Sequence, residues 1–368
     1  MKKFLSLLLV MLMTASLTAC GGSSSSGSND SSNDAASGDD GTYTKVSLSL
    51  AHGAAETTTM NQSMIYLKEI VEERSGGAVT IDLYPNQQLG ADRETTEAVT
   101  QGNISIACPS SSPVASFVPE LNVLDSPWVF NDRQKIYDTL DSEVGQKLLE
   151  TVSSANMKGL GYFENGIRHL SSNREINSMS DLKGLKIRVM ENDVQLAAWS
   201  AMGCNPAPLA FGEVYTALQQ KTFDAQENPM ELIYNTKFYE VQPYIYLTGH
   251  IYTAYTLVMN LDQWNSLNEA TQELLQECVN EAVAYNREHA EGAEQKCIDA
   301  INESGVSKVY EVSDEMKAEM AQACKDAGVY DKVRELAGDE ITNSRLPTNY
   351  ALNTFEIRSR RGGGGSVP

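Results

Sequence analysis

Apolar residues recur along the first part of the chain with two spacings that alternate. Apolar residues at every second position predict strands at 46–50, 79–83 and 104–108. Between them, apolar residues three or four positions apart predict helices at 60–71 and 92–101. Strands separated by helices of this length are typical of βαβ units. We therefore expect a mostly parallel sheet with helices on both faces.

The same alternation begins again near Lys158. Strands are predicted around 160–162 and 185–189, and a short strand followed by a loop is predicted over 222–228. Helical spacing covers 193–202 and 212–220. Since each of the two stretches can form its own sheet, the pattern predicts two α/β lobes.

A third pattern, from Asn268 to about Asn302, keeps helical spacing for an unusually long distance. One helix of this length would measure about 50 Å, which is longer than a single lobe is wide. We expect this helix to bridge both lobes, provided that no break occurs near Gly292.

The N-terminus has the pattern of a secretory signal peptide. Lys2 and Lys3 precede an apolar run over 4–17, which is shorter than the roughly 20 residues of a membrane-spanning helix. Leu17-Thr18-Ala19-Cys20 follows and resembles the bacterial lipobox, whose cysteine is acylated. This favours a lipid anchor on Cys20; the alternative is an ordinary signal peptide followed by an unmodified cysteine.

Two further segments are poor in apolar residues. Gly21 to about Gly41 consists mainly of Ser, Gly, Asn and Asp, so it is expected to form a flexible tether. The end of the chain from Arg358 is basic and rich in glycine, unlike the acidic body. We expect a disordered tail there.

Charge and composition exclude several kinds of site. The formal net charge of −21 argues against a nucleic-acid partner, because such binding draws on clustered Lys and Arg. Six cysteines and four histidines are scattered without metal-ligand spacing, so we expect no metal and no cofactor. An anionic ligand would need a local positive site on this acidic protein, which directs attention to individual arginines.

Arg188 lies near the carboxyl end of a predicted strand. Alternation buries Leu185, Ile187 and Val189 on one face and places Lys186 and Arg188 on the other. Ligands of open α/β sheets bind at the carboxyl ends of strands, and a guanidinium can hold a carboxylate with two parallel hydrogen bonds. The alternative is a solvated arginine paired with a nearby acid.

Two other polar positions follow predicted strands. Arg168 follows the strand through Tyr162 and could point into the same crevice. Asn228 ends the polar segment Asp224–Asn228 before Pro229, and its amide can both donate and accept hydrogen bonds. A capped polar loop is the alternative for that segment.

Enzyme motifs are absent from the sequence. It contains no Gly-x-Ser-x-Gly elbow, no HExxH and no phosphate loop, and Gly159-Leu160-Gly161 is only a fragment of a dinucleotide fingerprint. The acidic residues are too many to nominate an acid/base pair. A carboxylate-processing enzyme therefore remains only as an alternative to a binding protein.

Several ordered motifs together resemble the solute-binding proteins of TRAP transporters, the DctP type. They are Tyr84–Arg93, Gly166–Arg168, Gly184–Val189, Pro208–Gln219 and Asp224–Pro229. The resemblance extends from about residue 46 to 333. It implies an α/β, two-lobed, periplasmic-binding-protein-like fold (type II-like), with a cleft between the lobes that closes over an organic acid.

The resemblance also implies a division of the chain into lobes that are discontinuous in sequence. The expected parts are a lipoprotein signal peptide at 1–19, a lipidated Cys20 and tether at 20–42, lobe I at 43–165 and about 254–293, lobe II at 166–253 and about 294–348, and a tail at 349–368.

The family's binding residues can be placed on this sequence by its motifs. The resemblance implies that Arg188 makes the main salt bridge to the ligand, that Arg168 and Asn228 assist it, and that Phe211 packs near the ligand. Approximate alignment puts three further cleft positions at His52, Ser110 and Glu191. The chain departs from the family at Lys221 and Ala225, where glycine is common.

The polar character of the variable positions suits a hydroxylated ligand such as a uronate or another sugar acid, and a C4-dicarboxylate is comparably compatible. Glu191 would repel a second carboxylate unless an arginine paired with it. The implied partners are the membrane subunits of a TRAP transporter and, through the lipid anchor, the outer face of the cell membrane. The alternative partner is a sensor kinase.

Overall fold

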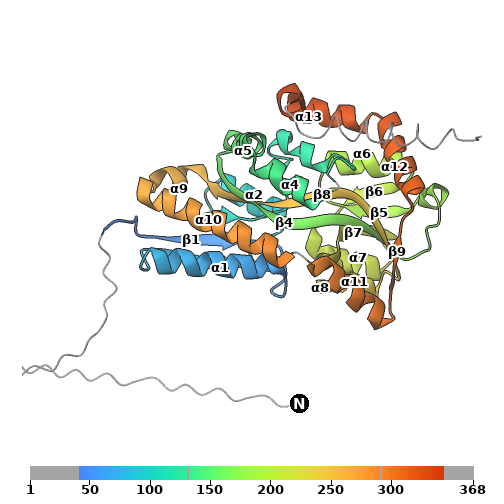
Figure 1. The fold of residues 1–368 in the computed structure, drawn as a ribbon, viewed down its shortest axis with the longest axis horizontal. Helices are drawn as coiled ribbons and strands as arrows, with labels where there is room; N and C mark the ends of the chain where they lie inside the picture. Colours follow the sequence, from blue (N-terminus) through green and yellow to red (C-terminus); the bar gives the residue numbers. More distant parts are fainter. Residues whose placement is uncertain (1–40, 131, 291, 344–368) are drawn as a thin grey trace, which may run out of the picture. The chain divides into compact units, whose positions relative to one another are not determined.

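The computed structural model describes residues 41–130, 132–290 and 292–343. Its strands form one nine-stranded sheet in the order β2-β1-β3-β8-β4-β7-β5-β6, with β9 paired to β8 (Figure 1). The strands are β1 (Val46–Ala51), β2 (Val79–Tyr84), β3 (Ile106–Ala107), β4 (Met157–Ser172), β5 (Lys186–Val189), β6 (Asn205–Pro208), β7 (Ala225–Pro229), β8 (Tyr244–Asn260) and β9 (Lys308–Glu311).

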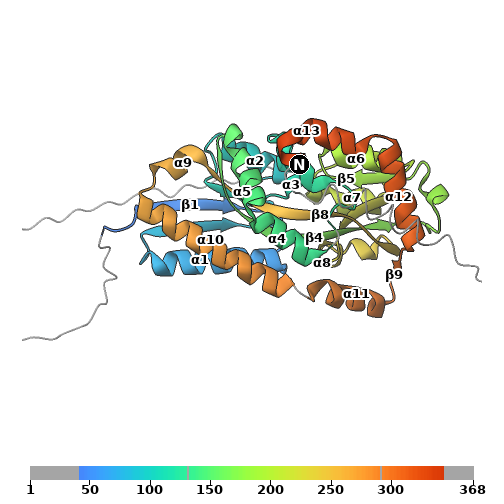
Figure 2. The same ribbon diagram turned by 45° about the horizontal axis from the view of Figure 1, so that its top comes forward.

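Helices cover both faces of the sheet (Figure 2). The α-helices are α1 (Thr59–Arg74), α2 (Asp92–Thr100), α3 (Ser111–Val114), α4 (Arg133–Asp141), α5 (Glu143–Glu150), α6 (Asp193–Ala201), α7 (Val214–Gln219), α8 (Met230–Asn235), α9 (Leu261–Ser266), α10 (Glu269–Ala290), α11 (Ala293–Ser304), α12 (Asp314–Asp326) and α13 (Val329–Asn343). Short 3-10 helices are η1 (Pro119–Asp125), η2 (Thr151–Ala155), η3 (Met179–Leu182), η4 (Phe211–Glu213) and η5 (Phe238–Glu240).

The sheet has two parallel parts, as the two alternating stretches predicted. In one part β1 pairs in parallel with β2 and β3, and in the other β5 pairs in parallel with β6 and β7. The long antiparallel strands β4 and β8 join them, from the pair Met157 and Asn260 at one end to Ser172 and Tyr244 at the other. The sheet is therefore parallel in both of these parts, as expected, and mixed as a whole, because β4 and β8 pair in antiparallel orientation.

The sequence pattern did not predict strand β8, because this strand is buried along nearly its whole length. From His250 to Asn260 every residue is buried. A strand covered on both faces has no polar side to alternate with, so its sequence is a continuous run. Alternation could therefore not reveal the strand that connects both parts of the sheet.

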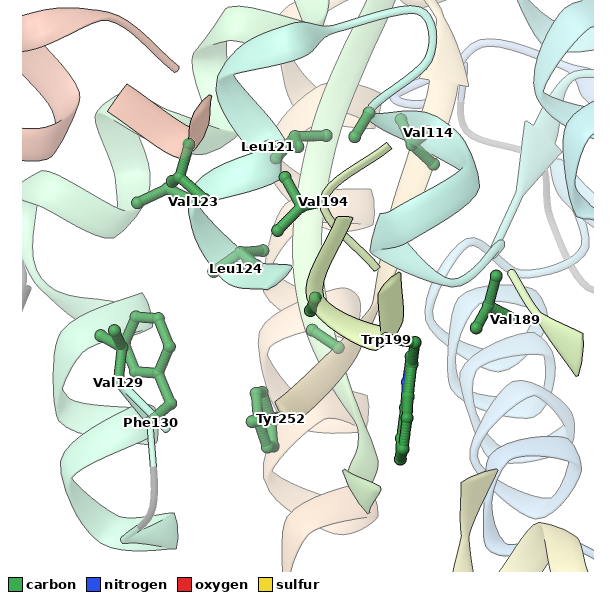
Figure 3. Packing of buried hydrophobic residues seen from close by; sticks show 14 of the residues in the cluster. Val114, Leu121, Val123, Leu124, Val129, Phe130, Val189, Val194, Trp199 and Tyr252 are labelled. Atoms are coloured by element: carbon green, nitrogen blue, oxygen red, sulfur yellow. The ribbon is translucent and has the colours of Figure 1, made fainter. Parts of the chain in front are cut away.

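Three apolar cores lie against the sheet. One packs α1 and α10 under β1 and β2, and α1 and α10 lie side by side in Figures 1 and 2. A second packs α7, α8 and α11 under the β5 part. The third, on the opposite face, is shared by both parts through η1, α6 and α13. Figure 3 labels members of this shared core from η1, α6 and β8: Leu121, Val123, Leu124, Val194, Trp199 and Tyr252.

The long helical pattern is two helices, which corrects the expectation of one unbroken helix. Gly292 stands between α10 and α11 with φ +74°, a left-handed conformation that glycine adopts without a steric penalty. Helix α10 contributes Cys278 to the core under β1, and α11 contributes Cys297 to the core under the β5 part. The segment thus crosses from one part of the sheet to the other as a pair of helices.

The departure from the family at Lys221 has a backbone explanation. The N–H groups of Lys221 and Thr222 bond to the carbonyls of Leu218 and Ala217, which closes α7 in a Schellman motif. Lys221 adopts φ +59°, the left-handed conformation for which glycine is preferred. The chain keeps the turn at this point with a non-glycine residue.

Several expected features fall outside the described residues. These are the signal segment at 1–19, Cys20, the tether up to residue 40 and the tail at 349–368. In the described part of the chain, no helix is long and apolar enough to cross a membrane. The five cysteines there, at 108, 204, 278, 297 and 324, are free and buried, as expected of small apolar residues.

Candidate functional site

A pocket opens where the carboxyl end of β5 faces the β1 part of the sheet. Its volume is about 510 Å³, including the portion open to solvent. Its charged and polar lining residues are Asp92, Arg93 and Ser110 from one part and Arg188, Glu191 and Asn228 from the other. Apolar contacts come from residues that include Met190, Phe211, Leu232 and Tyr255. A ligand in this pocket would touch both parts of the fold.

Arg188 is a buried cation, and one nitrogen of its guanidinium donates no hydrogen bond to the described residues. It lies near the carboxyl end of β5, as alternation predicted, but it is only 3% exposed. Its Nε and Nη2 donate to the carbonyl of Leu209 at 2.9 and 2.6 Å. Its Nη1 is buried and has no hydrogen-bond partner among the described residues. Burial lowers the pKa of Arg188 to about 10, which is still high enough for the side chain to be charged at neutral pH.

A buried donor on a cation without a partner is unfavourable unless something else supplies the acceptor. Asp92 and Glu191 line the same pocket and act on Arg188 through charge alone, without a hydrogen bond to it. The carbonyl of Leu209 fixes one side of the guanidinium and so sets its orientation. The geometry therefore suits an incoming anion at the remaining side.

Arg168 lies within β4, which extends past Tyr162, and it is fully buried. Its Nε and Nη2 both donate to the carboxylate of Glu227, with 2.8 Å between Nη2 and Oε1. Nη2 also donates to Oδ1 of Asn228 at 3.0 Å. Arg168 does not line the pocket, so its contact with the site runs through Asn228.

Glu227 is the centre of a buried charge cluster that the sequence did not single out. His250 contacts its Oε2 through Nε2 at 3.1 Å. Burial alone would raise the pKa of Glu227, but the charge of Arg168 and the bonds from His250 and Arg168 lower it to about 2. Trp199, labelled in Figure 3, meets the His250 ring edge-on at 5.1 Å. The cluster contacts the pocket through Arg168, which donates a hydrogen bond to the lining residue Asn228.

Asn228 has both ends of its amide fixed. It lies inside β7 instead of in a loop, opposite His169 of β4. Its Oδ1 accepts from Arg168 at 3.0 Å, and its Nδ2 donates to Oε1 of Gln226 at 2.6 Å. These two bonds determine which way the amide faces, so one Nδ2 hydrogen has a fixed direction for a ligand in the pocket.

Steric constraints explain the glycine of the Gly-Ile-Arg motif. Gly166 has φ +129°, and a Cβ there would lie 3.0 Å from the Cβ of Pro229. A larger residue would push β7 away from β4 at the point where Asn228 is held. Gly166 therefore permits the close strand contact on which the position of Asn228 depends.

The part of the pocket that faces Arg188 contributes a carboxylate, Asp92. Asp92 accepts a hydrogen bond at Oδ2 from the backbone N–H of Ser110 at 3.0 Å. Burial raises the pKa of Asp92, the Ser110 bonds and Arg188 lower it, and Glu191 raises it further. A Cβ on Gly53 would lie 3.0 Å from Oδ1 of Asp92, so glycine leaves room for this carboxylate. Sequence reasoning missed Asp92 as a site residue although it lies in one of the quoted motifs.

The remaining expected residues divide between the pocket and its surroundings. Ser110, Glu191 and Phe211 line the pocket, and the Phe211 ring packs edge-on against Phe238 at 5.9 Å. His52 is buried beside Gly53 and does not line the pocket. Burial lowers the pKa of His52 to about 4, so this imidazole is neutral at neutral pH. Its role in ligand binding stays a prediction.

The family model described as "Bacterial extracellular solute-binding protein, family 7" (DctP) matches residues 50–335. The chain belongs to this family. The match covers both parts of the sheet and every residue that lines the pocket.

Three similar proteins illustrate the family. A solute-binding protein of Verminephrobacter eiseniae is 36% identical over 269 residues, 73% of this chain and 79% of the relative. The sugar acid binding protein DctPAm of Advenella mimigardefordensis, solved with galactonate, has a TM-score of 0.79 at 28% identity, covering 84% of this chain and 99% of that one. A TRAP periplasmic solute binding protein of Shewanella oneidensis, solved with succinate, has a TM-score of 0.78 at 31% identity, covering 83% and 99%.

These similarities show what kind of protein contains the pocket. The protein is an extracytoplasmic solute-binding protein of the TRAP type, with a two-lobed α/β fold. Two of these similar proteins were solved with small organic acids, which agrees with a pocket that contains a buried arginine with an available donor. The expected family and fold class are thereby confirmed.

Proposed function

We propose that this DctP-family protein captures a hydroxylated organic acid through an ion pair between the ligand carboxylate and Arg188. It would then deliver the ligand, chemically unchanged, to the membrane subunits of a TRAP transporter. The observation that carries the proposal is the buried Nη1 of Arg188, which lacks an acceptor within the described residues. A carboxylate would supply that acceptor and neutralise a charge that burial disfavours.

Closure of two lobes over the ligand would complete the site. We place lobe I at 43–165 and about 254–293, and lobe II at 166–253 and about 294–348. The pocket residues Asp92 and Ser110 then belong to lobe I, and Arg188 and Asn228 to lobe II. A ligand that touches both lobes favours the closed arrangement by the contacts that only this arrangement provides.

The two carboxylates of the pocket, Asp92 and Glu191, favour ligand hydroxyl groups over a second ligand carboxylate. Asp92 and Glu191 both line the pocket, and each can accept a hydrogen bond from a ligand hydroxyl. A second ligand carboxylate near them would be repelled, and Arg93, an exposed lining residue, is the cation that could offset this repulsion. Because relatives bind galactonate and succinate respectively, both ligand classes are within the family's range. The charges in this pocket favour the sugar acid.

The ligand class can be tested with purified protein and three acids: galactonate, galacturonate and succinate. We expect the sugar acids to raise the melting temperature, and one of them to bind at least about tenfold more tightly than succinate in calorimetry. Glu191→Gln removes one repulsive charge and is expected to narrow this difference. NMR of the incubated acid should show no product.

Two results would count against this reading. If no organic acid in the panel raised the melting temperature, the proposal that the protein binds such acids would be wrong. If succinate bound more tightly than either sugar acid, and Glu191→Gln left the ratio of affinities unchanged, the pocket carboxylates would not select the ligand.

We also propose that a diacyl anchor on Cys20 holds the protein at the outer face of the cell membrane. The supporting observation is the sequence Leu17-Thr18-Ala19-Cys20 followed by a segment with almost no apolar residues. In cells, Cys20→Ser is expected to move the protein from the membrane fraction to the soluble extracytoplasmic fraction. Cys297→Ser, at a buried cysteine outside the motif, is the control. Equal membrane fractions for wild type and Cys20→Ser would exclude the anchor.

A further inference from the structure

We propose that Glu231 is a positioning residue that holds the closed arrangement of the two lobes by binding the N-terminus of helix α1. The inference rests on the proposed function, because it concerns how a ligand in the Arg188 pocket stabilises closure. It adds a contact outside the pocket that would slow the release of the ligand.

The contact consists of two hydrogen bonds to one carboxylate oxygen. Oε1 of Glu231, in α8, accepts from the backbone N–H of Thr59 at 2.7 Å and from its Oγ1 at 2.9 Å. Beside it, Oγ1 of Thr57 donates to Oδ1 of Asn235, also in α8, at 2.9 Å. Both ends of the short helix α8 are thus bonded to the start of α1.

Helix α1 needs an anion at this end. It has 16 residues, and its first turn, Thr-Met-Asn-Gln, contains no acidic residue to complement the helix dipole. Thr58 caps the N–H of Asn61, which leaves the N–H of Thr59 to find another acceptor. Glu231 provides that acceptor with a full negative charge, and charge-assisted hydrogen bonds are stronger than neutral ones.

The two helices belong to different cores. Helix α1 packs under β1 with α10, whereas Met230 and Ile233 of α8 pack under the β5 part. Since Glu231 and Thr59 share no core, their hydrogen bonds can break without disrupting the packing of either helix. This is the property required of a contact that forms on closure and is lost on opening.

The same short helix reaches the ligand pocket. Asn228, at the end of β7, and Leu232, next to Glu231, both line the pocket. A ligand seated against Asn228 and Leu232 therefore fixes the start of α8, and with it the position of Glu231. In this way ligand contact and the contact with α1 support one another.

The test compares ligand dissociation rates of variants at the contact, using the tightest acid from the panel. Glu231→Ala is expected to raise the dissociation rate about five- to tenfold and to leave the association rate within about twofold. Thr59→Val removes only the Oγ1 bond, so its effect should be smaller. In the double variant the two effects should not add, because both remove the same interaction.

A control variant and a second measurement distinguish a role of Glu231 in lobe closure from a role in the stability of the fold alone. Glu303→Ala removes the same charge from an exposed position of α11 and should leave the dissociation rate unchanged. The melting temperature of ligand-free Glu231→Ala should stay near that of wild type, while the increase caused by the ligand becomes smaller.

The proposal would be overturned if Glu231→Ala released the ligand at the wild-type rate. It would also be overturned if the ligand-free and ligand-bound melting temperatures fell equally, because that result indicates a static contact. A wild-type protein that bound no acid would instead refute the proposed function. In that case, small-angle scattering of wild type and Glu231→Ala would test lobe closure without a ligand.

Discussion

Replacing Arg188 with methionine is expected to weaken ligand binding by about a hundredfold or more. Removing one partner of a desolvated ion pair leaves the other charge buried and unpaired, a loss of about 3–5 kcal/mol. The ligand-free protein should not lose stability, because Arg188 is 3% exposed and its Nη1 has no acceptor. A neutral side chain of similar length removes that unfavourable charge.

Two measurements check this expectation. Calorimetry should show the loss of affinity, and thermal unfolding should show an unchanged or higher melting temperature without ligand. Arg188→Lys is the matched control, because it keeps the charge but cannot bond to Leu209 and to a ligand with one planar group. Wild-type affinity in the methionine variant would mean that the carboxylate binds elsewhere.

Replacing Glu227 with alanine is expected to destabilise the fold by about 3–5 kcal/mol. The substitution leaves Arg168 fully buried and without its carboxylate, and it removes the partner of His250. Glu303→Ala, at an exposed position, is the control and should change the free energy of unfolding by less than about 0.5 kcal/mol. Urea unfolding at neutral pH measures both variants.

The ion pair between Glu227 and Arg168 also predicts that the stability of the fold depends on pH. The pKa of Glu227 in the folded protein, about 2, lies below the ordinary value for a glutamate. Its contribution to stability is therefore complete above the ordinary pKa and decreases as the pH falls toward 2. The difference in unfolding free energy between wild type and Glu227→Ala should be smaller at pH 3 than at pH 7. A difference that does not change with pH would show that the ionised carboxylate is not the stabilising form.

The pocket was only partly predictable from the sequence. Alternation placed Arg188 at the carboxyl end of β5, because a strand's two faces follow directly from residue spacing. The pairing of Arg168 with Glu227 could not be read in this way, since the two residues are 59 positions apart and meet only when β4 and β7 align. Asp92 was missed because only the folded chain brings it beside Ser110.

The sequence by itself determined the two alternating stretches of strands and helices, the family motifs and the position of Arg188 near the end of β5. These properties depend on spacing over a few residues. The tertiary structure decided how β4 and β8 join the two parts of the sheet, where Gly292 divides the long helix, and which charged side chains line the pocket. Those properties depend on contacts between distant segments, and the buried strand β8 carries no alternation from which they could be inferred.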